Sequence, residues 1–329
     1  VLEEGLRGAG GILLNGDGER FLFDYDERGE RATRDIVSRA IYDEMRKGKT
    51  TPQGGVHIAM SHLGPDNVAR KFAGMVKRCA DCGFDLAGGL VEVVPTAHYF
   101  MGGVVVDTDT RTGLDGLYVA GEDAGGAHGA NRLGGNGVAN STVYGGIAGD
   151  VMGRDIASKS ALRDPDEAVL AAEIERAMHP VGRAAGDVHG LRTRLQNVMW
   201  DDVGVIRTKA GMTGALARLD EIEAELTQTG IAGGTLAFNL TWHDWLNLRS
   251  LVEISRVITL AGLARENSRG AHYREDHPDQ GALETSYYTH ARQDGDAVKV
   301  TREDVRFSIV RPGETILPEG EPDTLVAAE

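Results

Sequence analysis

The spacing of apolar residues predicts alternating strands and helices in the first 95 positions. Short apolar runs in GGILLN and RFLFDY, separated by a Gly-Asp-Gly turn, predict a β-hairpin within residues 1–25. Apolar residues at helical spacing in TRDIVSRAIYDEMRKG predict a helix with Thr33 as its N-cap. GGVHIAM predicts a strand, and PDNVARKFAGMVKRCADCGFD predicts one amphipathic helix with Pro65 at its start. This pattern is typical of an α+β domain.

Residues 90–150 follow a different pattern, in which glycines interrupt short apolar runs. The stretch LVEVVPTAHYFMGGVVVDTDTRT predicts β-structure, and GLYVAGE predicts a short buried strand. The small-residue segment NGVANSTVYGGIAGDVMGRDIA predicts a helix that begins at the Gly134–Gly137 turn. A strand, a glycine turn and a helix N-terminus together favour an anion or an electron-rich oxygen atom of a ligand.

The second half of the chain has a mainly helical pattern. Four apolar-periodic segments predict a bundle of three or four helices: DPDEAVLAAEIERAM, RTRLQNVMWDDVGVI, GMTGALARLDEIEAELTQ and WHDWLNLRSLVEISRVITLAGLARE. A charged loop, NSRGAHYREDHPDQ, precedes a hairpin around Asp294-Gly295, and the acidic tail has the composition of a disordered segment. We therefore expect an α+β multidomain chain with domains at residues 1–95, 96–150, 151–265 and 266–329.

Composition and missing motifs exclude several classes of protein. The net charge of −15, with basic and acidic residues interspersed, argues against a nucleic-acid-binding groove. No window approaches 18 apolar residues, and GxGxxG, GxxxxGK[ST], GxSxG and HExxH are absent. Cys79 and Cys82 form a lone CxxC without a thioredoxin context or further zinc ligands, so we interpret them as ordinary helix residues rather than redox or metal groups. No metal site is expected.

A scattered set of charged groups beside glycines remains as candidate chemistry. These groups are Glu4 and Arg7 in EEGLRG, Arg34 and Asp35 in TRDIVSR, His98 in TAHYFMGG, and Glu122, His128 and Arg132 in GEDAGGAHGANRLGGN. Each has an ordinary explanation when taken alone, such as a surface ion pair or a core histidine. Jointly they fit the binding and reduction of a small dianion. Its two carboxylates need bidentate arginine and a charge-assisted imidazole donor, and its carbon needs a proton delivered by a positioned relay.

Six motifs along the chain carry a resemblance to a known family. EEGLRGAGGILLN, TRDIVSRAI, PTAHYFMGGVVVD, GLYVAGED, HGANRLGGN and RENSRGAH occur in this order. With them the chain resembles the flavoprotein subunit of succinate dehydrogenase and fumarate reductase, whose relatives include L-aspartate oxidase. The resemblance is to the C-terminal portion of that family. It implies part of a capping domain (1–95), the C-terminal segment of the FAD-binding domain (96–150), a helical domain (151–265) and a small C-terminal domain with its tail (266–329).

The resemblance also implies roles for individual residues. Arg34 stands where the family places the arginine that exchanges a proton with the substrate carbon, and Glu4 and Arg7 match the relay from that arginine to solvent. His98 and Arg132 match the pair that holds one substrate carboxylate. Glu122 matches the acid that binds the FAD ribose. The other cofactor-binding residues implied are His128, Asn131, Gly135, Asn136, Gly137 and Val138.

The implied activity is FAD-dependent interconversion of succinate and fumarate, with hydride transfer at flavin N5. It implies a small dicarboxylate substrate and an iron–sulfur partner subunit. It also implies a cytoplasmic location, with membrane contact only through partners. Glu3 stands where the family has threonine, and Gly135-Asn136-Gly137-Val138 replaces Ser-Asn-Ser-Leu. Two alternatives therefore stay open: an L-aspartate-oxidase-like or other dicarboxylate oxidoreductase, and a non-catalytic fragment that docks a partner subunit.

Overall fold

The computed structural model describes residues 2, 4–158, 164–233, 235–295 and 297–315. These residues form two compact units, the first ending at Ser158 and the second made of residues 164–315. Helices and antiparallel strands occur in both units, so the predicted α+β multidomain class is confirmed. Glu3 and the predicted acidic tail from residue 316 lie outside the described residues.

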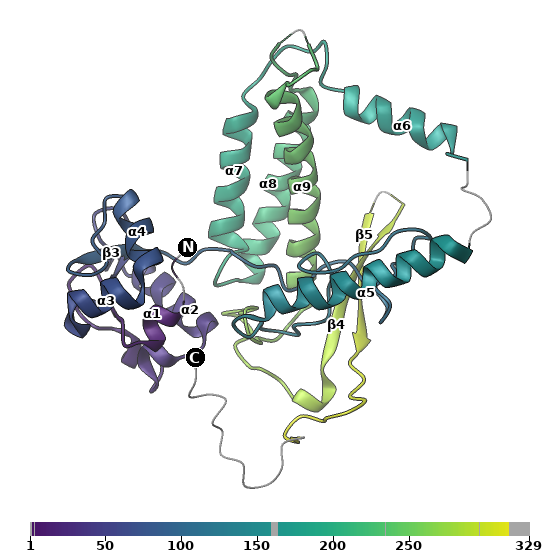
Figure 1. Cartoon of the computed structure of the whole chain (residues 1–329). Coiled ribbons are helices and arrows are strands. Elements are labelled where there is room, and N and C mark those ends of the chain that lie inside the picture. The colour runs from purple at the N-terminus through teal and green to yellow at the C-terminus, as the bar shows by residue number, and fades with distance from the viewer. Residues whose placement is uncertain (1, 3, 159–163, 234, 296, 316–329) are drawn as a thin grey trace. The chain divides into compact units, whose positions relative to one another are not determined.

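A three-stranded antiparallel sheet organises the first 95 residues (Figure 1). Its order is β1 (Ile12–Leu14), β2 (Val56–Ala59) and β3 (Leu90–Val93). Leu13 lies opposite Ile58, and Ile58 lies opposite Val91. All three side chains are buried, because residues paired across neighbouring strands point to the same face of a sheet. The predicted strand GGVHIAM is confirmed by β2.

Helices pack their apolar residues against this sheet. They are α1 (Gly5–Gly8), η1 (Leu22–Asp24), η2 (Gly29–Arg31), α2 (Arg34–Arg46), η3 (Ser61–Leu63), α3 (Pro65–Lys71) and α4 (Ala73–Asp81). Helix α2 begins directly after Thr33, as predicted, and buries Val37, Ala40 and Ile41 at helical spacing. Together with Leu6 and Leu13, these residues belong to one continuous apolar core.

Two predictions for this region are only partly met. The turn at Gly16–Gly18 is closed by a single antiparallel bridge between Leu14 and Arg20, after which RFLFDY continues as the 3-10 helix η1 instead of a strand, and β1 pairs with β2. This arrangement buries both Phe21 and Leu22 in the core, whereas alternation along a strand would turn one of them outward. The single helix predicted from Pro65 is divided into α3 and α4 at Phe72, whose backbone angles (φ −117°, ψ 36°) are not helical. Cys79 is buried in α4 and Cys82 is exposed at its end.

The backbone between residues 94 and 135 is largely irregular. The strands predicted there, including GLYVAGE, are absent from the described segment, which has only isolated bridges that join Val104 to Ala124 and Arg111 to Tyr118. The backbone N–H and C=O groups of a strand need partners on a neighbouring strand. The described residues of this region offer no pairing longer than these single bridges. Helix α5 (Asn136–Ser158) begins at the predicted glycine turn and continues through the domain boundary predicted at residue 150.

The second unit contains a bundle of long helices (Figure 1). Figure 1 shows α7 (Val188–Asp202), α8 (Lys209–Gln228) and α9 (Leu240–Ala264) side by side. Residues that α8 buries, such as Met212, Ala215 and Leu219, recur at intervals of three and four, as the sequence predicts. Helix α6 (Glu167–Met178) buries none of its residues, so the bundle has three core helices. Asp166 caps α6 by accepting from Ala168 N (2.9 Å), which confirms the predicted start.

The C-terminal part of this unit is a packed loop followed by a hairpin. Strands β4 (Tyr287–Asp294) and β5 (Ala297–Asp304) pair in antiparallel register, as predicted around Asp294-Gly295, and η4 (Leu283–Thr285) precedes them. The charged segment 267–280 is not a solvated loop: Arg274 is only 1% exposed and Arg269 only 9%. Their guanidinium groups are buried because backbone carbonyl oxygens accept their hydrogen bonds.

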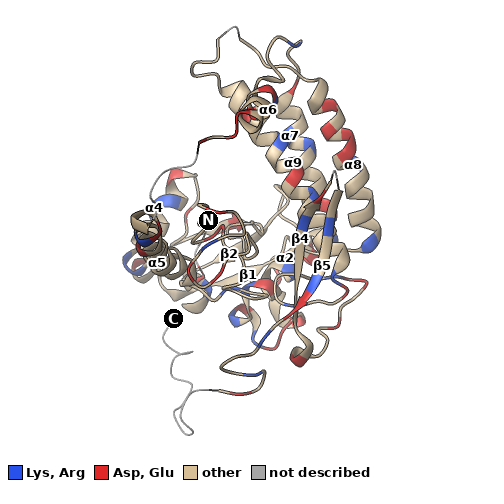
Figure 2. Cartoon of the chain, turned by 90° about the vertical axis from the view of Figure 1, so that its right-hand side faces the viewer, with Lys and Arg blue, Asp and Glu red and all other residues tan. Residues whose placement is uncertain are grey.

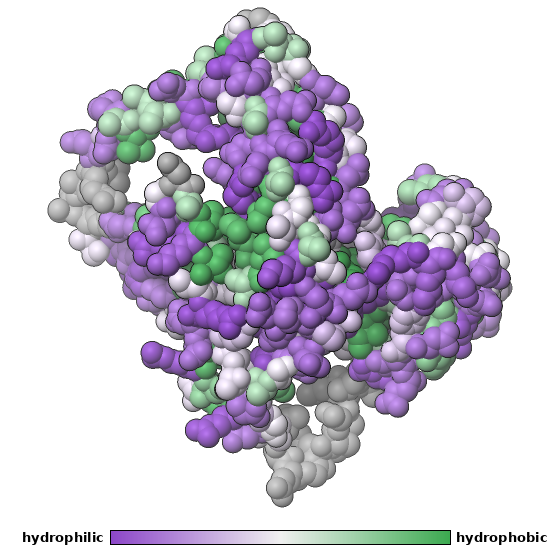
Figure 3. Space-filling model, turned by 180° about the vertical axis from the view of Figure 1, so that it is seen from behind, coloured by the Kyte–Doolittle hydropathy of each residue, from purple (hydrophilic) through white to green (hydrophobic). Residues whose placement is uncertain are grey.

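The surface is mainly polar and of mixed charge. Figure 2 shows Lys and Arg interspersed with Asp and Glu along α7, α8 and α9, as expected from the sequence. Figure 3 shows apolar patches within an otherwise hydrophilic surface. Exposed apolar side chains include Val138 and Ile156 of α5 and Val169 and Ile174 of α6. Among the helices that the structure describes, none is long and apolar enough to cross a membrane.

Candidate active site

Four segments of the first unit bring together four of the predicted site residues. Arg34, the first residue of α2, places Nη1 2.9 Å from His98 Nε2 and donates from Nη2 to Glu4 Oε2. Arg132 places its Nη2 3.4 Å from the same His98 nitrogen. Residues that are as much as 128 positions apart in the sequence, from Glu4 to Arg132, therefore meet around one imidazole ring.

His98 acts as a hydrogen-bond acceptor in this arrangement. Guanidinium nitrogens can only donate, so the Nε2 atom that faces Arg34 and Arg132 carries no proton. The other ring nitrogen, Nδ1, lies 3.4 Å from Thr96 O and is the protonated one. The charge-assisted imidazole donor toward a substrate carboxylate stays a prediction.

Glu4 connects Arg34 to Arg7, as the predicted relay requires. One carboxylate oxygen of Glu4 accepts from Arg34, and the other accepts from Arg7 Nη2 at 3.2 Å. Arg7 Nη1 donates to the carbonyl oxygens of Glu30 (2.6 Å) and Ala32 (3.2 Å). Burial lowers the pKa of the Arg7 guanidinium, the Glu4 carboxylate raises it, and the charge of Arg34 lowers it. The net effect is a lowered pKa, so Arg7 gives up a proton more readily than a solvated arginine.

Arg132 is held by contacts that leave part of its guanidinium available. Its guanidinium carbon lies 4.3 Å from the centre of the Tyr99 ring, a cation–π contact. Its backbone N–H donates to Met101 Sδ (3.1 Å), and Nη1 donates to Leu133 O (3.2 Å). The Nε atom is buried, and among the described residues it has no hydrogen-bond partner. A buried donor without an acceptor requires an explanation, and a bound carboxylate would supply the acceptor.

His128 lies behind Arg132 in a polar cluster. Its Nε2 lies 3.0 Å from Tyr99 Oη and 3.2 Å from Asn140 Nδ2, and Asn140 also donates to Gly121 O (3.1 Å). Because the Asn140 amide donates to His128 Nε2, the proton of the neutral ring is on Nδ1. Burial, and then the charge of Arg132, lowers the pKa of His128. His128 thus presents an N–H donor, as expected of a group that binds a cofactor oxygen or nitrogen.

The residues predicted to bind FAD fit such a group. Helix α5 begins at Asn136 with no acidic side chain in its first turn, so its N-terminus is available to an electron-rich ligand. Gly135 has φ +77°, and a Cβ placed there would meet nothing within 4 Å, which leaves open space. Glu122 Oε1 accepts from Phe100 N (2.8 Å), an anchor that leaves acceptor capacity for a hydroxyl group. Gly137 packs against Tyr99, and Val138 is 77% exposed.

Asn131 has a different contact from the one predicted. Its Nδ2 donates to Asp35 Oδ1 (2.9 Å), and Asp35 also pairs with Arg39 (3.0 Å). Asn131 precedes Arg132 and Asp35 follows Arg34, so this hydrogen bond joins the two segments that carry the arginines. In the structure Asn131 positions the site, and its role toward a cofactor stays a prediction.

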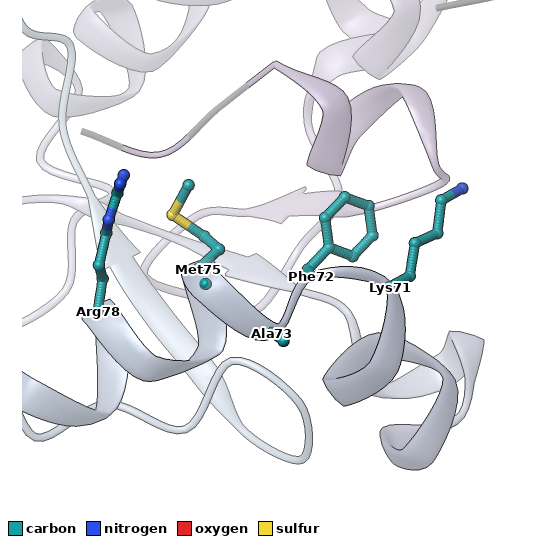
Figure 4. Close-up of a pocket in the computed structure, with 6 residues that line it drawn as sticks. Lys71, Phe72, Ala73, Met75 and Arg78 are labelled. Carbon is teal, nitrogen blue, oxygen red and sulfur yellow. The ribbon is translucent and has the colours of Figure 1, made fainter.

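Three arginines of a strongly acidic chain meet at the site. Arg7 and Arg34 donate to the Glu4 carboxylate, and Arg132 lies beside His98. In the part of the chain that the structure describes, no group of three or more His, Cys, Asp or Glu side chains could hold a metal ion. An open hollow of about 240 Å³ beside α3 and α4, lined by Lys71, Phe72 and Arg78 among others, contains none of these site residues (Figure 4). The candidate site therefore lies apart from that hollow.

Three residues of the site were not identified from the sequence. Tyr99, Asn140 and Glu30 each contact or anchor a predicted site residue. Tyr99 directly follows His98 in TAHYFMGG, so adjacency to a motif residue could have suggested it. Asn140 and Glu30 have no comparable signal, because only the folded chain brings them to the site.

Comparisons with known proteins agree with this geometry. The FAD binding domain family matches residues 1–138, and the family of fumarate reductase flavoprotein C-terminal domains matches residues 192–317. A fumarate reductase (CoM/CoB) subunit of Methanothermobacter marburgensis is 39% identical over 279 residues, which cover 85% of this chain and 50% of that protein. An L-aspartate oxidase of Yersinia pestis is 38% identical over 284 residues, with the same coverage. The chain spans about half the length of these curated relatives.

A solved structure shows the same fold. The chain superimposes on a structure of quinol–fumarate reductase with menaquinol molecules with a TM-score of 0.86, at 29% identity, over 95% of this chain and 58% of that one. The two family matches and the fold place the chain among the flavoproteins of FAD-dependent oxidoreductases. Its relatives are fumarate reductase and L-aspartate oxidase flavoproteins, which confirms the resemblance found in the sequence.

Proposed function

We propose that this chain supplies the dicarboxylate site and the proton relay of an FAD-dependent enzyme that interconverts succinate and fumarate. The observation that carries the proposal is the approach of Arg34 and Arg132 to one atom, His98 Nε2, at 2.9 and 3.4 Å. Arg34 also pairs with Glu4, whereas no carboxylate of the described residues pairs with Arg132, so a bound carboxylate would supply the missing counter-charge. A carboxylate can accept from both guanidinium groups and from the unpaired Arg132 Nε.

The relay suits the transfer of a proton to or from the substrate carbon. Arg34 faces the site and is bonded to Glu4, which in turn is bonded to Arg7. In the reduction of fumarate, Arg34 gives a proton to the carbon and regains one from Arg7 through Glu4; oxidation of succinate reverses the path. Bound FAD would supply the hydride acceptor or donor for the other carbon. Glu122, His128 and the start of α5 would hold it.

The Arg34→Lys substitution tests this proposal in the complete, FAD-loaded flavoprotein. We expect fumarate reduction to fall by about a hundredfold to ten-thousandfold, the usual contribution of a positioned acid. Arg28→Lys is the control, because Arg28 also pairs with a carboxylate, Asp26 (2.8 Å), without touching the site. If Arg34→Lys reduces fumarate as fast as Arg28→Lys does, Arg34 is not the proton donor.

Oxidation of L-aspartate is the second candidate. The Yersinia pestis relative, 38% identical to this chain, is named an L-aspartate oxidase. Steady-state kinetics with both substrates decide between the two: a higher kcat/KM for L-aspartate than for succinate would favour this second candidate.

We further propose that electrons pass to or from an iron–sulfur partner subunit, and that any membrane contact runs through such partners. The support is that the Methanothermobacter relative is named as one subunit of its enzyme. Purification from the source cells under mild conditions tests this. An iron–sulfur protein in stoichiometric amount with the flavoprotein is expected, and a flavoprotein recovered alone with full activity toward quinols contradicts it.

A further inference from the structure

Glu30 is a buried carboxylate beside the relay that no predicted role uses. It lies in η2 and is only 4% exposed. Its Oε1 accepts from Leu13 N (3.1 Å) and Arg20 Nε (2.9 Å), and its Oε2 accepts from Arg20 Nη2 (2.6 Å). Burial would raise the pKa of Glu30, but the hydrogen bonds from Arg20 and Leu13 lower it overall. The carboxylate is therefore ionised and fixes η2 to strand β1.

The backbone of the same segment holds Arg7. The carbonyl oxygen of Glu30 accepts from Arg7 Nη1 at 2.6 Å, and that of Ala32 accepts from it at 3.2 Å. Arg7 is thus held between the Glu4 carboxylate and these two carbonyl groups. Movement of residues 30–32 would remove two of the three acceptors of the Arg7 guanidinium.

This segment also determines where Arg34 lies. Thr33 is the N-cap of α2, but its side chain makes no capping hydrogen bond, so the start of the helix depends on the residues before it. Arg34 follows Ala32 by two positions and bonds the same Glu4 carboxylate as Arg7. The distance between the two arginines of the relay is therefore set by the segment that the Glu30 carboxylate anchors.

We propose that Glu30 is a positioning residue of the proton relay, which holds Arg7 and Arg34 at the two oxygens of Glu4. This inference rests on the proposed function, because it requires that Arg34 and Arg7 move protons. It assigns Glu30 no contact with substrate. Loss of its anchor therefore slows the proton step and leaves the contacts of His98 and Arg132 with a dicarboxylate unchanged.

Glu44 provides a matched control for Glu30. It is also 4% exposed, and it accepts from Asn15 Nδ2 (2.9 Å), Tyr25 Oη (2.7 Å) and Lys47 Nζ (3.2 Å). None of these residues belongs to the relay. Glu30→Gln and Glu44→Gln each remove the charge of one buried, hydrogen-bonded carboxylate, so a general loss of stability affects both variants.

The test compares these variants in the complete, FAD-loaded flavoprotein. We expect Glu30→Gln to lower kcat for fumarate reduction at least about tenfold, because small misplacement of catalytic groups has effects of this size or more, with KM within about twofold. Its solvent deuterium isotope effect should rise as proton transfer becomes slower. Glu44→Gln should leave kcat, KM and the isotope effect unchanged. Equal kcat values for the two variants, or a change in KM alone, would overturn the inference.

A labelling experiment on this 329-residue chain tests the same inference without catalysis. The Arg7 side chain is 11% exposed, and we expect Glu30→Gln to increase its modification by phenylglyoxal severalfold, measured by mass spectrometry, while Glu44→Gln does not. If Glu30→Gln fails to fold, Arg20→Gln replaces it. Arg20 is 45% exposed, and its loss removes two of the three hydrogen bonds that the Glu30 carboxylate accepts. Unchanged Arg7 labelling in the folded variant contradicts the proposal.

Failure of this inference is distinguishable from failure of the proposed function. If Arg34→Lys stays fully active, the proton relay itself is wrong, whatever Glu30→Gln does. If Arg34→Lys is inactive while Glu30→Gln behaves as Glu44→Gln does, the relay stands and only the role of Glu30 is wrong.

Discussion

Two regions of this chain place arginine guanidinium groups around a histidine, and they differ in how completely the guanidinium groups are satisfied. In the first unit, Arg34 and Arg132 approach His98. In the second unit, Arg207 Nη1 lies 2.8 Å from His272 Nδ1, and Arg274 lies in the same buried cluster. The residue types are alike, so composition alone does not separate a binding site from a structural cluster.

The buried cluster has acceptors throughout. Arg274 donates to the carbonyl oxygens of Gly262, Leu263 and Arg265 and pairs through two nitrogens with Asp276. Arg207 donates from Nε to Val203 and Gly204 carbonyl oxygens. These carbonyl groups lie at or just beyond the C-terminal ends of α7 and α9, where positive charge is favoured by the helix dipole. This cluster therefore holds helix ends together.

The first-unit site lacks that saturation. Arg34 and Glu4 are 31% and 44% exposed, and Arg132 Nε has no acceptor among the described residues. Unsatisfied donors together with access from solvent indicate a ligand site, whereas satisfied donors in a buried setting indicate a structural role. The experiments below test this difference.

The largest effect on stability is expected for Arg274→Gln. It leaves Asp276, which is 32% exposed, and the α9 carbonyl groups without the buried guanidinium, and breaking a fully buried ion pair costs about 3–5 kcal/mol of unfolding free energy, which is the upper bound here. Arg111→Gln is the control, because Arg111 pairs with Asp155 through two nitrogens in a more exposed setting, where such pairs contribute at most about 1 kcal/mol. Urea unfolding measures both, and similar losses would contradict the structural role of the cluster.

A comparable effect is expected from pH through His272. Burial, and then the charge of Arg207, lowers the pKa of His272 to about 4, against 6.5 for the free side chain. The unfolded chain therefore binds a proton between these values that the folded chain does not. The unfolding free energy should fall as the pH drops from about 6.5 to 4, by about 3 kcal/mol from this residue. His272→Asn should reduce that slope, and an unchanged slope would show that other groups cause it.

For the open site, Arg132→Gln should weaken the binding of malonate, an unreactive dicarboxylate, to this chain. Charge-assisted hydrogen bonds contribute about 1.5–3 kcal/mol, so the dissociation constant should rise about tenfold to a hundredfold. Isothermal titration calorimetry measures it. Arg274→Gln, in a folded preparation, should bind malonate as the unmodified chain does; equal weakening by both substitutions would remove the distinction between the two clusters.

The smallest effect is expected for Tyr99→Leu, which removes the ring beneath Arg132. A cation–π contact is worth about 0.5–2 kcal/mol, so the affinity for malonate should fall about twofold to thirtyfold. Tyr287→Leu is the control, because Tyr287 stacks with Arg265 and Arg302 (4.6 Å each) in the second unit. If Tyr99→Leu binds malonate as tightly as Tyr287→Leu, the ring does not position Arg132.

Local signals predicted much of the regular structure. The start of α2 after Thr33, strand β2, the cap at Asp166 and the hairpin around Gly295 all depend on neighbouring residues, and all are present. The division between α3 and α4 was not predictable in this way, because Phe72 is neither glycine nor proline. The absent strands between residues 94 and 121 depend on pairing partners, which a local pattern cannot supply.

The two arginine clusters show the same limit. Arg34, His98 and Arg132 were proposed from a resemblance between motifs, and the structure brings them together. Arg274 lies in the segment that the sequence predicts to be a charged loop, yet it is 1% exposed. Its burial depends on carbonyl groups at the end of α9, which come together and lack intrahelical partners only once the helix has formed. The sequence motifs were enough to locate the site. Which arginine donors have acceptors, and which do not, could be seen only in the folded chain.

Titration of malonate into the unmodified chain tests the central claim most directly. The chain carries a net charge of −15, so nonspecific attraction of an anion is not expected. At low ionic strength we predict one site per chain with a dissociation constant on the order of 1 mM or tighter, competition by fumarate, and much weaker binding of acetate. Absence of binding, or binding that Arg132→Gln leaves unchanged, would contradict the assignment of the Arg34–His98–Arg132 cluster as a dicarboxylate site.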